Sequence, residues 1–397
     1  MKKIIAISAV LLFLPISIFG ESGKKASEFN KTIELKIAKQ MVDDSSYQKK
    51  EPLETKPAIS KIDRPIILDT DADFLSEPLP SADPQRYKGW RETAKINVGQ
   101  SHLSTADLTG DGRYLLAMSE MEATVRVYLA NTKKLIGNFK VPGFEYGSFD
   151  RGEVVLWPET GGGPTFLVGN EVGLNLFSGL TGDLVTHLDG SPVWHMRWSP
   201  DGRILICVLS DISTQTSVLT LFKRVDPNSL KRIETIKFKN RVNGFALSRD
   251  NRYMAVTFYP SDLVELIDLH KGGAVWSIPA PTFSRPVDIS LDGRKVAVGG
   301  QYLILIDAEN PSHISTYKDF QNNLHNVRFS PSGDAVAVSS YDGHVRIIST
   351  DMGSSNAALI KDLRHAGTSN VYSLVFGGDG AFLISSSGDK TIRFWGK

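Results

Sequence analysis

A short turn motif recurs along the chain, and its spacing is the strongest constraint on the fold. The motif begins with Ser, Thr or Gly and ends with Gly or Asn three residues later, and two short apolar runs follow each copy. The seven copies begin at Thr109, Thr160, Ser199, Ser248, Ser290, Ser330 and Gly377. Their mean spacing is about 45 residues, and short strands at that period cannot bury both faces without stacking against copies of themselves. The pattern therefore predicts one all-β repeat structure.

The last copy is the most complete, and it carries a resemblance. The segment from Leu363 to Trp395 reads LRHAGTSNVYSLVFGGDGAFLISSSGDKTIRFW and is similar to one repeat of the WD-repeat family. The matching residues are His365, Val371, Leu374, Phe376, Asp379, Gly380, Ser385, Asp389, Thr391, Ile392, Arg393 and Trp395. It departs from the family pattern at Arg364, where a Gly is usual, and at Gly377–Gly378, where Ser-Pro is usual. The resemblance implies that each unit is one blade of a β-propeller.

Seven units predict a seven-bladed β-propeller over residues 91–397, provided that its ends are joined. The last unit stops at Lys397, two residues after Trp395, and so lacks the fourth strand that the other units contain. An extra strand pattern, Arg91 to Gly99, precedes the first unit. We expect this segment to supply the missing strand, so that three C-terminal strands and one N-terminal strand close the ring and remove its exposed sheet edges.

The first 20 residues have the layout of a secretory signal peptide. Lys2 and Lys3 precede an apolar run of about sixteen residues, which is short for a membrane span, and the small residue Gly20 ends it. We expect an exported bacterial protein located in the periplasm, in the cell envelope or outside the cell, with no transmembrane segment after cleavage. The alternative is an uncleaved membrane anchor.

Residues 21–90 do not follow the repeat. A short amphipathic helix is possible between Lys25 and Met41, and polar, Pro-rich and acidic stretches follow it. We interpret this region as a flexible linker arm, in which Ile66 to Leu68 dock on the ring. A partner-binding arm is the alternative.

Charge and cysteine content exclude several classes of protein. The formal net charge of +1 becomes −1 without Lys2 and Lys3, which gives no electrostatic case for a nucleic acid as the main partner. The single Cys207 lies in an apolar run, so we expect a buried thiol, no internal disulfide and no cysteine-based metal cluster. We predict a monomer that needs no cofactor.

Two acidic motifs resemble calcium sites, but we interpret them as structural. Asp69, Asp71 and Asp73 open like a calcium loop, yet the Gly and Glu that such a loop needs further on are missing. Asp107 and Asp111 fall in and beside the recurring turn motif. We therefore predict no metal site and no catalytic residues. The alternative is a secreted hydrolase or lactonase with acids and histidines at the mouth of the central channel.

Four residues of the last unit resemble a catalytic set, and the resemblance assigns them another role. In the WD-repeat family a His, a Ser and an Asp are linked to a Trp through hydrogen bonds, and the matching positions are His365, Ser385, Asp389 and Trp395. A Ser-His-Asp set also suggests nucleophilic catalysis. The resemblance implies a structural tetrad that stiffens the blade.

The predicted function is that of a non-catalytic scaffold for protein partners. In the WD-repeat family, the face with the loops from fourth to first strands is the usual docking surface. Trp, Tyr and Arg are enriched at such surfaces. The candidate binding residues on that face are Trp194, His195, Arg285, His325 and Tyr372. The alternative is that these residues only pack between blades.

Overall fold

A computed structural model describes most of the chain. The described residues are 62, 64–68, 70–99, 103–119, 122–141, 153–157, 163–170, 172–211, 216–226, 228–367 and 369–397. The chain divides into two compact units, Met1–Lys56 and Pro57–Lys397, and all described residues belong to the second. The predicted signal peptide (1–20) and the possible helix at Lys25–Met41 lie outside the described residues.

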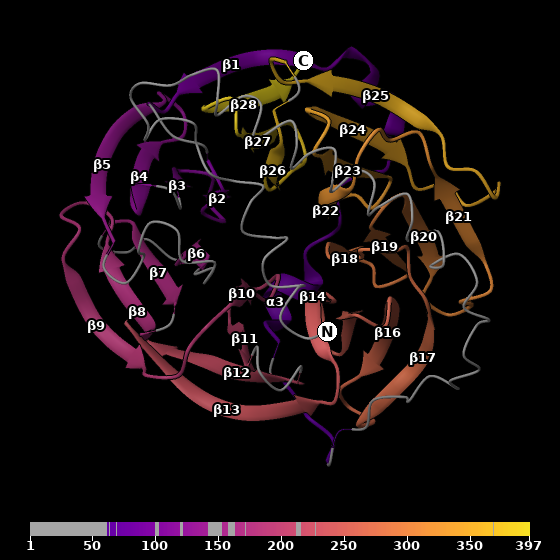
Figure 1. Ribbon diagram of the computed structural model, residues 1–397, viewed down its shortest axis with the longest axis horizontal. Helices are drawn as coiled ribbons and strands as arrows, with labels where there is room; N and C mark the ends of the chain where they lie inside the picture. The colour runs from indigo at the N-terminus through magenta and orange to yellow at the C-terminus, as the bar shows by residue number, and fades with distance from the viewer. Residues whose placement is uncertain are drawn as a thin grey trace, which may run out of the picture. The chain divides into compact units, whose positions relative to one another are not determined.

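The described strands form seven antiparallel sheets of four strands, arranged around a ring (Figure 1). Each sheet is one blade, and we call its strands a to d from the inside of the ring outward. Blades 1 and 2 consist of β2 (Thr105–Leu108), β3 (Tyr114–Ser119), β4 (Thr124–Leu129) and β5 (Lys134–Lys140), then β6 (Glu153–Leu156), β7 (Thr165–Asn170), β8 (Gly173–Ser178) and β9 (Leu184–Asp189). Blades 3 and 4 consist of β10 (His195–Trp198), β11 (Ile204–Asp211), β12 (Thr216–Asp226) and β13 (Ser229–Phe238), then β14 (Arg241–Leu247), β15 (Tyr253–Tyr259), β16 (Leu263–Asp268) and β17 (Gly273–Pro279).

The remaining three blades repeat the same order, and the last of them joins the two ends of the ring. Blades 5 and 6 consist of β18 (Val287–Ile289), β19 (Lys295–Gly299), β20 (Leu303–Asp307) and β21 (Ile314–Tyr317), then β22 (Leu324–Phe329), β23 (Ala335–Ser340), β24 (His344–Ser349) and β25 (Leu359–Arg364). Blade 7 consists of β26 (Val371–Phe376), β27 (Leu383–Ser387), β28 (Thr391–Gly396) and β1 (Arg91–Asn97).

The predicted closure is confirmed. Strand β1 pairs antiparallel with β28, with Arg91 opposite Gly396 and Ile96 opposite Ile392. An ion pair between Arg393 and Glu92, 2.6 Å from Nη1 to Oε2, adds a side-chain link across the same junction. The chain therefore forms the seven-bladed propeller that the sequence predicts, and its first described strand is the outer strand of its last blade (Figure 1).

The recurring motif is a turn between strands a and b that is held by its own side chains. In blade 3 the Ser199 hydroxyl donates to Asp201 (2.5 Å) and accepts from the amide of Ile204 (2.9 Å). The same pattern joins Ser248 to Asp250 and Ser290 to Asp292. Because a short polar side chain satisfies the turn amides, the motif recurs wherever the chain reverses at this point.

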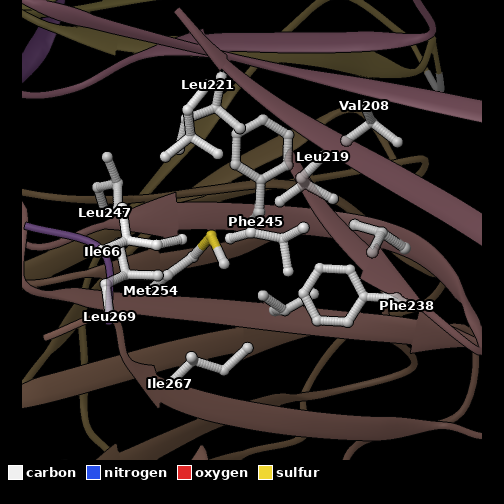
Figure 2. Close-up of a cluster of buried hydrophobic side chains, with 14 of the residues drawn as sticks. Ile66, Val208, Leu219, Leu221, Phe238, Phe245, Leu247, Met254, Ile267 and Leu269 are labelled. Atoms are coloured by element: carbon white, nitrogen blue, oxygen red, sulfur yellow. The ribbon is translucent and has the colours of Figure 1, made fainter. Parts of the chain in front are cut away.

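The core consists of seven apolar clusters, one between each pair of neighbouring blades. Figure 2 shows the cluster between blades 3 and 4, where Leu219 and Leu221 of β12 lie against Phe245 and Met254 of blade 4. Strands b and c are covered on both faces, which explains their nearly continuous apolar sequences. Burying each such side chain contributes about 1.5–3 kcal/mol, so the stacking of blades supplies most of the driving force for the fold.

The described residues from 62 to 90 form a segment that we call the N-terminal strap. At one end, Ile66 and Leu68 are buried in the cluster between blades 3 and 4, whereas Ile67 between them is 76% exposed (Figure 2). This confirms the expected docking of these residues on the ring. At the other end, Tyr87 and Trp90 are buried in the cluster between blades 6 and 7. The strap therefore inserts side chains into two separate interfaces of the ring.

Between these anchors the strap follows the face that carries the turns from strand a to strand b, which we call the a–b face. It contains α3 (Ala72–Ser76) and the 3-10 helix η2 (Pro84–Gly89). The guanidinium of Arg249 lies 4.6 Å from the Phe74 ring centroid and donates to the carbonyl of Glu77. The amide of Asp83 donates to Asp334, in the a–b turn of blade 6. The strap thus covers part of the a–b face of blades 3, 4 and 6.

The acidic motif at the start of the strap has a structural role in the described residues. Asp71 caps α3 by accepting from the amides of Asp73 and Phe74, and it forms an ion pair with Arg203. Asp69 lies outside the described residues. Within the described ranges, no group of three or more His, Cys, Asp or Glu side chains is arranged to hold a metal ion. None of the described helices is long and apolar enough to cross a bilayer.

Candidate functional site

The five predicted binding residues all lie where strand a begins, on the face opposite the a–b turns. We call it the d–a face, after the connections from strand d of one blade to strand a of the next. His195 begins β10, and His325 and Tyr372 are the second residues of β22 and β26. Trp194 and Arg285 lie just before β10 and β18. All five side chains are half-buried, so they belong neither to the core nor to the outer surface.

Two of these residues come together with a third aromatic side chain. His325 and Tyr372 lie at 5.1 Å between ring centroids, and Tyr341, in the turn after β23, lies 5.2 Å from His325. Both pairs are edge-to-face, the geometry that aromatic quadrupoles favour. His325 Nδ1 is also 2.8 Å from the carbonyl oxygen of Tyr372. This aromatic cluster connects blades 6 and 7 on the d–a face.

Two other predicted residues meet around an acid that sequence analysis did not single out. His195 Nδ1 lies 3.7 Å from Glu153 Oε2 of blade 2, and this carboxylate also accepts from the amide of Met196. Burial works to raise the pKa of Glu153, but His195, the Met196 amide and Arg285 outweigh it and lower that pKa below its ordinary value. Trp194 joins neither group, and its buried indole N–H has no acceptor among the described residues.

The inner a strands surround the centre of the ring, which we call the channel, and they carry a set of charged side chains that the prediction missed. Two residues before the turn motif, four of the seven a strands carry an ionisable residue: Asp107, Arg197, Asp288 and Arg328. Arg197 of blade 3 and Asp288 of blade 5 form an ion pair of 2.6 Å that passes blade 4. Blade 4 carries the small residue Ala246 at the same register, which leaves room for this pair.

The acids of this ring bind the backbone of the neighbouring blade. Strand a has one edge without a partner strand, so its amides need other acceptors. Asp107 accepts from the amide of Leu156 in blade 2 at 2.8 Å, and Asp288 accepts from the amide of Phe329 in blade 6 at 2.9 Å. Asp107 therefore does not join Asp111, which stabilises the a–b turn by accepting from Thr109 and the Arg113 amide. The predicted turn role of Asp111 agrees with these contacts, whereas Asp107, which was also expected to belong to the turn, lies in strand a and binds the next blade instead.

The sequence contains a pattern from which the channel residues could have been predicted. In DLTGDG, RWSPDG, DISLDG and RFSPSG, a charged residue stands two places before the turn motif, within an otherwise apolar strand. The same register in four repeats places these side chains on one level of the ring, since corresponding residues of equivalent strands lie at equivalent heights. Aligning the repeats on charge as well as on apolar residues would have found them.

Two exposed aromatic residues also lie on the d–a face. Tyr259, at the end of β15, is 46% exposed, and Phe283, in the connection between β17 and β18, is 55% exposed. The Phe283 amide donates to Asp262, in the turn between β15 and β16, which joins the two loops. Sequence analysis did not select either residue, because loops lack the alternation that identifies strands.

The residues of the predicted tetrad are joined in blade 7 by a chain of hydrogen bonds. The indole N–H of Trp395 donates to Ser385 Oγ at 2.7 Å, and Ser385 Oγ lies 2.7 Å from His365 Nε2. His365 Nδ1 lies 3.2 Å from Asp389 Oδ2. A neutral imidazole with its proton on Nδ1 satisfies every contact: Trp395 donates to Ser385, Ser385 to His365, and His365 to Asp389.

Burial and charge act in opposite directions on the two titratable members of the tetrad. Burial lowers the pKa of His365 below its ordinary value despite the nearby Asp389 carboxylate. Burial also works to raise the pKa of Asp389, but hydrogen bonds from His365 and Thr391 dominate and hold that pKa well below its usual range. The His365 and Ser385 side chains are fully enclosed, so this Ser-His-Asp set is not open to a substrate.

Comparison with known protein families finds the WD40 repeat, described as WD domain, G-beta repeat, at residues 180–211, 312–349 and 358–396. The second and third matched segments each contain the outer strand of one blade and three strands of the next, and the first contains the outer strand β9 and the first two strands of blade 3. The sequence repeat is thus displaced by one strand from the structural blade. This displacement explains why a lone outer strand remains at the start of the ring and closes it.

The relatives that match are eukaryotic, and each is matched over a short region. A segment of 124 residues is 32% identical to echinoderm microtubule-associated protein-like 3 of Homo sapiens and covers 30% of this chain and 14% of that protein. Another, of 80 residues, is 35% identical to WD repeat-containing protein 1 of Mus musculus and covers 20% and 13%. A third is 31% identical to Protein SOF1 of Saccharomyces cerevisiae over 83 residues, 21% of this chain and 16% of that protein. The matched segments and the seven four-stranded blades together identify WD40 repeats in this chain, assembled into a seven-bladed propeller.

Proposed function

We propose that the ring is a non-catalytic platform whose protein partner docks on the d–a face. The observation that carries this proposal is the difference between the two faces. The a–b face is covered in part by the chain's own strap, whereas the d–a face presents Tyr259 and Phe283 to solvent and also carries the cluster of His325, Tyr341 and Tyr372. Aromatic side chains supply a large share of binding energy in protein interfaces.

The backbone at Phe283 supports a binding role for this loop. Phe283 has φ of +61°, in the left-handed region that residues other than Gly rarely adopt. This backbone conformation costs about 1 kcal/mol or more. Burial of the Phe283 side chain offsets little of that cost, because the residue is 55% exposed. Strained residues that present a side chain to solvent cluster at binding sites. We therefore place Phe283 at the centre of the proposed docking surface.

The candidate residues chosen from sequence surround this surface and have different roles in it. His325 and Tyr372 are held in place by aromatic contacts, because each of their rings packs edge-to-face against another ring. His195 and Arg285 lie around Glu153, at the channel. A partner that presents an apolar side chain to Phe283 and Tyr259 and polar groups toward the channel fits this arrangement.

The test compares two double variants with matched exposed area. Tyr259→Ser with Phe283→Ser removes the aromatic pair from the d–a face. Leu184→Ser with Val185→Ser, on the outer strand β9, removes apolar side chains that are 55% and 41% exposed. Cross-linking in the source cells, followed by affinity capture and quantitative mass spectrometry, measures the partner. If each aromatic residue contributes about 2 kcal/mol, the first variant loses tenfold or more of the capture seen with the wild type.

The second variant should capture the same partner as the wild type. Equal capture by both variants, with unchanged melting temperatures, would reject the d–a face as the docking surface. Tyr372→Ala is a useful third variant, because it tests whether the aromatic cluster of blades 6 and 7 belongs to the same surface.

We also infer that the chain is exported to a bacterial cell envelope, or beyond it. This part of the proposal rests on residues 1–20, whose basic start and short apolar run are typical of signal peptides. Mass spectrometry of the mature N-terminus should show cleavage after Gly20 or close to it. A chain that retains Met1 and fractionates with cytosolic proteins would contradict export.

A further inference from the structure

Arg328 has an unusual set of contacts for an arginine inside a protein. Its guanidinium carries five N–H donors, and its one hydrogen bond to the described residues is from Nη1 to the carbonyl of the preceding Val327, at 3.1 Å. No carboxylate of the described residues lies within 4.0 Å of its nitrogen atoms. By contrast, Arg197, its nearest cationic neighbour in the channel, is paired with Asp288.

The groups that act on Arg328 place it inside the channel. It interacts electrostatically with Asp107 of blade 1, Glu153 of blade 2, Arg197 of blade 3 and Asp288 of blade 5. A side chain from blade 6 approaches all four blades only if it extends into the central channel. Burial, and next the charge of Arg197, lower the pKa of Arg328 to about 10.

The three acids around Arg328 are held away from it by other bonds. Asp107 accepts from the amides of Leu108 and Leu156, and Asp288 accepts from Arg197 and the amide of Phe329. Glu153 accepts from the amide of Met196 and lies beside His195. Turning any of these side chains toward Arg328 would leave a backbone amide of an a strand without its acceptor, at a cost of about 1–3 kcal/mol.

We propose that Arg328 is the centre of a carboxylate-binding site in the channel. A carboxylate matches the planar donor pair of a guanidinium and binds it through two parallel hydrogen bonds. Three carboxylates already stand around the site, so a ligand with one negative charge is favoured over a dianion such as phosphate. The proposed site does not depend on docking of a protein to the d–a face.

The ligand reaches this site from the d–a face. On the other side of the ring, α3 lies over the middle of the blades in Figure 1, and the strap around it contacts the a–b turns of blades 3 and 4. Glu153 and His195 lie two residues nearer to the d–a face than Arg328 in the aligned a strands. The carboxylate belongs either to a small free acid or to an acidic side chain that a partner inserts.

The experiment follows the arginine side chains of the full chain by nitrogen-15 NMR during titration with sodium acetate. Sodium chloride at the same ionic strength is the reference. We expect one Nε–H resonance to shift and saturate with acetate, and the same resonance to be missing in Arg328→Gln. Sodium phosphate at equal ionic strength should give a shift at least several-fold weaker.

Arg294→Gln is the matched control, because Arg294 is an exposed arginine after the a–b turn of blade 5 and lies outside the channel. It should leave the acetate titration unchanged. If Arg328→Gln does not fold, Arg328→Lys keeps the charge and removes the paired donors, and the acetate-dependent shift of the Arg197 Nε–H resonance should then report binding about tenfold weaker than in the wild type. A wild-type titration with acetate that matches chloride, or saturable binding that Arg328→Lys retains in full, would overturn the proposal.

Two blocked peptides identify the source of the carboxylate. N-acetyl-Gly-Glu-Gly-amide should produce the same shift if a partner's acidic side chain enters the channel, and N-acetyl-Gly-Gln-Gly-amide should not. A response to acetate without a response to the glutamate peptide supports the same site with a small free acid as its ligand.

Discussion

Two polar clusters of this propeller, the buried tetrad of blade 7 and the partly exposed charged ring of the channel, follow opposite rules. In the tetrad, the donors of Trp395, Ser385 and His365 each have an acceptor, and the chain ends on Asp389. In the channel, the acids are satisfied by backbone amides of neighbouring blades, but among the described residues Arg328 has a single carbonyl as its acceptor. One cluster is complete within the chain and the other is incomplete.

The difference distinguishes a stabilising network from a binding site. A complete network strengthens the fold because removing any member leaves a partner unsatisfied in a place that water does not reach. An incomplete network is costly to bury, and a ligand that supplies the missing charge lowers that cost. The same residue types, Asp, His, Ser and Arg, therefore serve structure in blade 7 and recognition in the channel. Substitutions of matched type in the two clusters test this interpretation.

Asp389→Asn should have the largest effect. The variant removes a carboxylate that accepts from His365, Thr391 and Arg393 in a buried site, and about 3 kcal/mol of unfolding free energy should be lost near pH 7. Because the folded state holds the pKa of Asp389 below its value in the unfolded chain, this contribution is present above about pH 4 and is lost as the solution is acidified. Urea unfolding at pH 7 and pH 3 measures both values.

The loss should thus be smaller at pH 3 than at pH 7. An equal loss at both pH values would show that the hydrogen bonds matter through their geometry alone and that the charge of Asp389 contributes nothing.

His365→Gln should have an intermediate effect, about 2 kcal/mol, because the amide keeps one of the two hydrogen bonds of the imidazole. Burial lowers the pKa of His365 in the folded state, so the unfolded chain binds more protons just below pH 6.5. Stability of the wild type should therefore decrease as pH falls below 6.5, and this part of the decrease should disappear in the variant. A titration of melting temperature between pH 5 and pH 8 measures it, with His344→Gln, at the start of β24 in blade 6, as the control.

The tetrad and the closure of the ring could be predicted because their residues belong to one repeat or to the ends of the series. His365, Ser385, Asp389 and Trp395 fall within 31 positions of one another in the best-preserved copy, so a resemblance to one family motif locates all four. The closure followed from a count of strands, since a unit without its fourth strand needs one from elsewhere.

The channel could not be predicted in the same way, because its contacts connect residues that are far apart in the chain. Arg197 and Asp288 are 91 positions apart and lie in blades 3 and 5, which are not neighbours in the ring. Only the radius of the ring and the small size of Ala246 bring them together. The second anchor of the strap was missed for a related reason: Tyr87 and Trp90 occupy the interface between blades 6 and 7, and nothing in their local sequence indicates a binding site more than 200 residues away.

Asp107→Asn should have the smallest effect, and it sharpens the comparison because it repeats the substitution of Asp389 in the other cluster. Burial raises the pKa of Asp107 in the folded state, which means that the fold disfavours its charged form despite the Leu156 and Leu108 amides. The asparagine oxygen can replace one of these two acceptors, so a loss of about 1 kcal/mol is offset by removal of the buried charge. The net change at pH 7 should lie within about 1 kcal/mol of zero.

The sign of the pH dependence distinguishes the two substitutions more clearly than the size of the change in unfolding free energy at one pH. The wild type loses stability as pH rises from about 4 through the raised pKa of Asp107, since the folded state must then give up a proton it holds more firmly than the unfolded chain does. Relative to the wild type, the unfolding free energy of Asp107→Asn should therefore increase as pH rises, whereas that of Asp389→Asn should decrease. Unfolding free energies of both variants at pH 3 and pH 7 decide the matter. Parallel slopes would mean that the two acids have equivalent environments, and the distinction between a complete and an incomplete polar cluster would then lose its physical basis.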